Sequence, residues 1–177
     1  MIQKIAFLVI FLSTLYDCSS QKTAKAQEDS LIEIYFVPNN MTTYNDRKRT
    51  SYYEYKDHGT YITVKDKIFE KNLRKKLSDL DGRSRGKHGM RIKILLKNES
   101  SIDSVFMSYL PRAVVNYNNF SYPGSPELLN LVVLKIKEHY EKRDFICEGP
   151  RCKQEIDQDD IDFMNVILRN CEEYINK

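Results

Sequence analysis

Short runs of β-branched and aromatic residues recur along this chain and predict a strand-rich fold. The first run, 31–37 (LIEIYFV), predicts the first strand. Two more, 51–56 and 60–65, flank the turn Asp57-His58-Gly59 and predict a hairpin. Three further runs follow one another closely, at 90–96, 102–110 and 113–118. Because the links between these three are short, they predict an antiparallel meander.

Three other segments have the spacing of amphipathic helices. Asp66 is a suitable N-cap for the first, Ser125 followed by Pro126 starts the second, and the third spans 158–175. The apolar residues of the first are Ile68, Phe69, Leu73, Leu77 and Leu80. Those of the second are Leu129, Val132, Val133, Ile136 and Tyr140. Those of the third are Ile161, Met164, Leu168, Cys171 and Ile175.

Strands therefore alternate with helices in the order β, ββα, βββα, α. Links of hairpin length between successive strands favour an antiparallel sheet rather than a parallel one. We expect a single α+β domain over residues 31–177, in which an antiparallel sheet of about six short strands has two to three helices packed on one face.

The first 17 residues differ from everything that follows. Lys4 is basic, residues 5–16 are almost wholly apolar, and residues 18–30 are polar. An apolar run of about twelve residues suits a signal peptide and is shorter than the ~20 residues of a membrane-spanning helix. The pattern predicts a signal peptide over 1–17 and a flexible tether over 18–30.

The residues at the end of this leader, Leu15-Tyr16-Asp17-Cys18-Ser19-Ser20, resemble the lipobox of bacterial lipoproteins. Leu15 fits that pattern, whereas Tyr16 and Asp17 stand where small residues are usual. The chain is thus similar to the many uncharacterised small lipoproteins of Gram-negative cell envelopes. The resemblance implies lipidation of Cys18 and a membrane partner, and it carries over no catalytic residue. Cleavage after Ala26 is the alternative, and it would yield a soluble periplasmic or secreted protein.

Three cysteines remain beyond Cys18, namely Cys147, Cys152 and Cys171. In an oxidising compartment an odd number predicts one disulfide and one spare thiol. A bridge between Cys147 and Cys152 would close a short loop around a Gly-Pro turn. A bridge from Cys171 to either of the others would instead fasten the last helix to that loop.

The segment 65–97 is strongly basic, with twelve Lys and Arg residues against four acidic ones. It predicts an anion-binding patch for lipid headgroups, a polyanionic glycan or an acidic protein. The candidate residues are Lys71, Arg74, Lys75, Arg83, Arg85 and Lys87. The alternative is a solvated face partly neutralised by the acidic last helix. The net charge of +3 argues neither for nor against a nucleic-acid partner. We expect no nucleic-acid partner because the protein is predicted to be exported.

Nothing in the sequence has the spacing of a catalytic or metal site. The histidines, His58, His88 and His139, are neither spaced as ligand pairs nor placed beside a nucleophile and a carboxylate. We therefore expect no cofactor and a non-enzymatic binding module of the envelope. An immunity- or inhibitor-type protein is one alternative. An enzyme with a site around Asp57, His58 and the neighbouring tyrosines is another.

Overall fold

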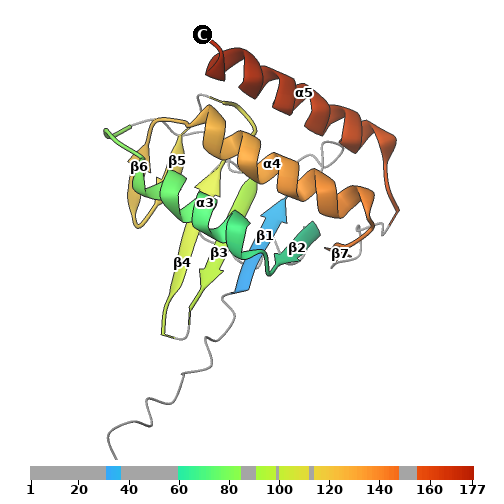
Figure 1. Ribbon diagram of the computed structural model, residues 1–177, viewed down its shortest axis with the longest axis horizontal. Coiled ribbons are helices and arrows are strands. Elements are labelled where there is room, and N and C mark those ends of the chain that lie inside the picture. The colour runs from blue at the N-terminus through green and yellow to red at the C-terminus, as the bar shows by residue number, and fades with distance from the viewer. Residues whose placement is uncertain (1–30, 37–59, 85–90, 99, 112–113, 148–154) are drawn as a thin grey trace, which may run out of the picture.

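The computed structural model describes residues 31–36, 60–84, 91–98, 100–111, 114–147 and 155–177 (Figure 1). The strands in these ranges are β1 (Leu31–Phe36), β2 (Thr60–Val64), β3 (Ile92–Lys97), β4 (Ile102–Met107), β5 (Val115–Tyr117), β6 (Phe120–Tyr122) and β7 (Ile146–Cys147). The helices are α3 (Lys67–Ser78), α4 (Pro126–Glu141) and α5 (Gln158–Ile175). The predicted strand at 51–56, the leader 1–17 and the tether 18–30 lie outside the described residues.

The strands form a 7-stranded sheet in the order β6-β5-β4-β3-β1-β2-β7. Every neighbouring pair is antiparallel. Strands β3 to β6 form a meander, as the sequence predicts for the first three of them. Strand β1 lies inside the sheet because β2 and β3 pair with its two edges. Helix α3 therefore crosses over β1 on its way from β2 to β3.

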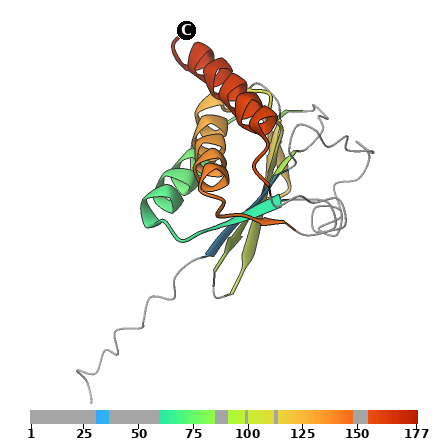
Figure 2. The same cartoon turned by 90° about the vertical axis from the view of Figure 1, so that its right-hand side faces the viewer.

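One face of the sheet builds the hydrophobic core. In the register of the sheet, Ile34 stands beside Ile62 on one side and Ile94 on the other, and Val105 lies next to Ile94. All four side chains have no exposed surface. Figure 2 shows the three helices together on one side of the sheet. The predicted α+β class, with an antiparallel sheet and helices packed on one face, is confirmed.

The helices form a layer in which α4 is central. Both α3 and α5 pack against α4, and they lie on opposite flanks of it (Figures 1 and 2). The buried residues of α4 include all five that the sequence assigns to its apolar face. Helix α3 is thus an outer helix, with one side on the core and the other toward solvent.

Strand β6 was not predicted from the sequence. Asn118 and Asn119 both have positive φ, at 48° and 64°, which matches the two-residue hairpin turn that joins β5 to β6. An Asn-Asn pair between two aromatic residues is a usable hairpin signal. The two-residue strand β7 was not predicted either, and the predicted strand at 51–56 lies outside the described residues. The described residues therefore form seven strands, where about six were expected.

Candidate functional site on helix α3

Helix α3 begins at a cap that the sequence identifies correctly. The Asp66 carboxylate accepts hydrogen bonds from the backbone N–H groups of Ile68 and Phe69, at 2.9 and 3.0 Å. Phe69, Leu73 and Leu77 recur every fourth residue and are at most 3 % exposed. Capping and burial therefore fix both the start of the helix and the face that it turns to the core.

The opposite side of α3 presents two lysines and an isoleucine to solvent. Lys71 and Lys75 each follow a buried residue by two positions, which is about 200° around an α-helix. Both are exposed, and Ile68 beside them is 75 % exposed. The spacing i, i+3, i+7 places the three on one stripe. We call Ile68, Lys71 and Lys75 the basic face of α3.

The two lysines of the basic face have no acidic partner among the described residues. Neither Lys71 nor Lys75 makes an ion pair or hydrogen bond through its side chain within the ranges described above. Arg74, by contrast, lies 2.8 Å from Glu70 and donates to Asn98 at 3.0 Å. Like charges at i and i+4 repel each other by a few tenths of a kcal/mol. Within the described ranges, the basic face thus holds a pair of positive charges with no ion-pair partner.

The residues of the predicted anion-binding patch do not all lie together in the structure. Lys71 and Lys75 are neighbours on α3, but the guanidinium of Arg74 is bound to Glu70 and Asn98. Arg83 lies further along the chain, with its guanidinium 5.3 Å from the centre of the exposed Phe120 ring. Arg85 and Lys87 lie outside the described residues. The part of the patch that can be built from geometry is therefore the basic face.

The sequence pattern grouped Ile68 with the apolar residues that face the core. In the structure Ile68 is exposed instead, on the side of α3 away from Phe69, Leu73 and Leu77. The i, i+4, i+8 spacing of those three residues was the signal that would have separated it from them.

The acidic last helix does not neutralise the basic face. Helix α5 contains five acidic residues and one arginine, but α4 lies between it and α3 (Figure 1). The alternative interpretation, in which α5 partly neutralises the basic segment, is therefore not supported for the part of the segment that lies on α3. The two outer helices of the layer carry opposite net charges, positive on α3 and negative on α5.

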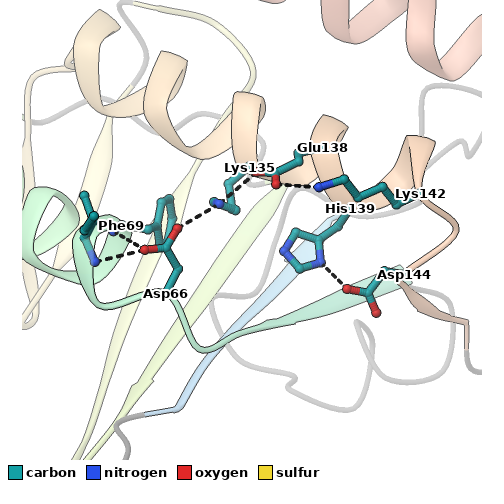
Figure 3. Close-up of polar contacts among 8 residues, drawn as sticks. Asp66, Phe69, Lys135, Glu138, His139, Lys142 and Asp144 are labelled. Carbon is teal, nitrogen blue, oxygen red and sulfur yellow. Dashed lines mark hydrogen bonds and ion pairs between the residues drawn. The ribbon is translucent and has the colours of Figure 1, made fainter.

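A row of alternating charges joins the start of α3 to α4 (Figure 3). The Lys135 ammonium lies 3.1 Å from Asp66 and 2.8 Å from Glu138, and Lys142 reaches the other oxygen of Glu138 at 2.8 Å. The ammonium also lies 5.6 Å from the centre of the Phe69 ring. Two carboxylates thus meet two ammonium groups, so this row has no spare charge for a ligand and serves to hold α3 against α4.

The protonation states of this row argue against proton transfer near pH 7. Hydrogen bonds from Lys135 and Lys142 lower the pKa of Glu138 to about 2. Desolvation opposes the charge of Lys135, but its hydrogen bonds to Glu138 and Asp66 outweigh that effect and raise its pKa. A general acid or base works best with a pKa near the working pH, and both groups are shifted away from it.

Replacing Lys135 by Gln should return the pKa of Glu138 toward its ordinary value of 4.5. The remaining contact with Lys142 should keep the pKa somewhat below that value. The carboxyl carbon shift of Glu138, followed by NMR during an acid titration, measures this directly. Lys137→Gln is a matched control, because Lys137 pairs with Glu141 on the same helix. A Glu138 pKa that stays near 2 in the Lys135 variant would contradict the assignment.

His139 lies in the last turn of α4, where its carbonyl accepts a hydrogen bond that ends the helix. Its Nδ1 lies 2.8 Å from an oxygen of Asp144, although the two do not meet in hydrogen-bond geometry. The backbone N–H of Asp144 donates to the His139 carbonyl at 2.9 Å, which satisfies one terminal carbonyl of the helix. Within the described part of the chain no nucleophilic side chain is paired with this histidine. His58, Asp57 and His88 lie outside that part.

Of the two alternative disulfides, the structure excludes the one from Cys171. Cys171 is a free, fully buried thiol on α5, so the predicted bridge from this residue is wrong. Burial raises its pKa to about 11, which keeps it protonated and unreactive at neutral pH. Cys147 lies at the end of β7. Cys152 lies outside the described residues, so the bridge between these two stays a prediction.

Among the described residues, no cluster of His, Cys, Asp or Glu has the arrangement of a metal site. None of the helices in those same ranges combines the length and the apolar character that crossing a membrane requires. Comparison with protein-family models, with curated proteins and with solved structures gave no match.

Proposed function

We propose that this chain is an exported, lipid-anchored envelope protein that binds an anionic partner through the basic face of α3 and catalyses no reaction. The observation that carries the proposal is the exposed, uncompensated pair Lys71 and Lys75 on a rigidly capped helix. Two like charges at this spacing cost the free protein some stability, and a bound anion would remove that cost.

The leader supports the compartment in this proposal. An apolar run of signal-peptide length ahead of Cys18 is the reason to expect export and lipidation. A binding role fits the remaining geometry, because the charge row around Lys135 is internally neutral and the Cys171 thiol is buried and protonated. An immunity- or inhibitor-type role, and a soluble form cleaved after Ala26, stay predictions of the sequence.

The binding role can be tested with heparin as a soluble polyanionic probe. The double variant Lys71→Gln/Lys75→Gln should elute from a heparin column at clearly lower salt than the unmodified protein, because fewer counterions are exchanged on binding. The matched control is Arg169→Gln/Lys177→Gln, which removes the same charge from α5 and the residues after it. Equal elution of the first variant and the unmodified protein would count against the basic face as a binding surface.

The anchor can be tested on the same preparation by the mass of the mature N-terminus. A lipidated Cys18 is the expected result. A free Gln27 would replace the anchor by secretion, and an intact Met1 would remove the export part of the proposal.

A further inference from the structure

The start of the folded domain and the start of α3 lie at the same end of the sheet. Ile32 pairs with Val64, so the last residue of β2 stands beside the beginning of β1. Helix α3 begins at Lys67, three residues after Val64. The first residues of β1 and the first turn of α3 are therefore close along the sheet, joined through the end of β2. Whatever holds the chain ahead of Leu31 also holds the neighbourhood of α3.

The distance from the predicted anchor is short. Residues 19–30 separate Cys18 from Leu31. A chain of this length spans at most about 45 Å when extended and about 20 Å on average as a flexible coil. Helix α3, with 12 residues, is about 18 Å long. A lipid on Cys18 would therefore keep the basic face within one domain diameter of the bilayer.

The composition of the basic face suits the headgroup layer of a bilayer better than a purely ionic partner. Two lysines with long apolar stems follow the 75 % exposed Ile68 on the same stripe, about one and two helical turns further along α3. Basic residues are attracted to anionic lipids, while an apolar side chain beside them can enter the boundary with the acyl chains. The acidic flank at α5 would be repelled by the same surface. Attraction at one flank and repulsion at the other select one orientation.

We infer that the anionic partner of the basic face is the phospholipid headgroup layer of the membrane that carries the anchor. This inference rests on the proposed function and names the partner of that same site. The domain then lies on the bilayer with α3 toward the lipid and α5 away from it. The basic face would then orient the domain on the bilayer to which the lipid on Cys18 attaches it.

The test compares the partitioning of the purified full-length mature protein into two kinds of vesicle. One contains phosphatidylglycerol and phosphatidylcholine, and the other contains phosphatidylcholine alone. Any lipid on Cys18 contributes to both, so the ratio of the two partition coefficients isolates the electrostatic part. Each lysine near an anionic surface contributes about 5-fold, so Lys71→Gln/Lys75→Gln should lower the ratio by about 25-fold. The control Arg169→Gln/Lys177→Gln should leave it unchanged.

The outcomes separate this inference from the function on which it rests. A ratio that falls only in the α3 variant, and that vanishes at 1 M salt where the Debye length is about 3 Å, supports the inference. A ratio near one for the unmodified protein overturns it. If heparin binding still depends on Lys71 and Lys75 in that case, the proposed function stands with a soluble polyanion as partner. If heparin binding is also independent of them, both fail.

Discussion

Replacing Leu73 by Ala is expected to lower the free energy of unfolding by about 2–5 kcal/mol. Leu73 is fully buried at the centre of the apolar side of α3, between Phe69 and Leu77. Truncation removes its transfer free energy and leaves a cavity under a helix that packs against α4 at the flank of the helix layer. The midpoint of urea unfolding at neutral pH, with an unchanged slope, measures the loss.

Ile68→Ala on the same helix is the matched control. Ile68 is 75 % exposed, and Ala is the better helix former, so the free energy of unfolding should change by no more than about 0.5 kcal/mol. A similar loss in both variants would mean that α3 does not present the sides described here. The basic face would then not be a fixed surface, and the binding proposal would lose its structural basis.

Local signals in the sequence were sufficient to locate the helices. Asp66, Ser125 and Asp157 each cap a helix by accepting backbone hydrogen bonds, and these bonds join residues two or three apart in the chain. The predicted bounds of the third helix, 158–175, match those of α5. The class of fold followed because the apolar sides of such helices need an apolar sheet face to cover.

Long-range features were beyond what the sequence could show. The partner of the Asp66 cap, Lys135, is 69 residues away, and only the packing of α3 on α4 brings the two together. Neutralisation of the basic segment by the acidic residues of α5 was one alternative, because composition gives the sign of a segment's charge and not the segment's position. Which flank of α4 each helix occupies depends on where the strands between them pair, and strand pairing is a property of the whole sheet.

Removing the Tyr140 hydroxyl should also destabilise the domain measurably. This hydroxyl donates to the Asp160 carboxylate at 2.9 Å and accepts from the backbone N–H of Asp157 at 3.1 Å. Both Tyr140 and Asp160 are at most 3 % exposed, so groups that lose a partner here gain little from water. Tyr140→Phe keeps the ring stacked on Phe145 but leaves these groups with one partner fewer. At pH 7 the expected loss is about 1–3 kcal/mol of unfolding free energy.

The titration of Tyr140 predicts that the difference in stability between the unmodified protein and Tyr140→Phe becomes smaller at high pH. Desolvation is the main reason that the pKa of Tyr140 rises from 10.0 to about 12. The folded state therefore holds this proton more tightly than the unfolded chain does, and its stabilising effect is complete below pH 10. As the pH rises from about 10 to about 12 the unfolded state binds fewer protons, so stability falls, by about 3 kcal/mol for a shift of this size. The Phe variant lacks this titration, and the difference between the two proteins should shrink across that window.

Urea unfolding at several values between pH 7 and pH 12 tests this prediction, because every other titrating group is common to both proteins and cancels in the difference. Tyr174→Phe is the control, since Tyr174 is 38 % exposed. A difference between Tyr140→Phe and the unmodified protein that stays constant up to pH 12 would show that the Tyr140 proton is not held more tightly in the folded state. No difference at pH 7 would show that the bonds to Asp157 and Asp160 do not fasten the start of α5 to α4.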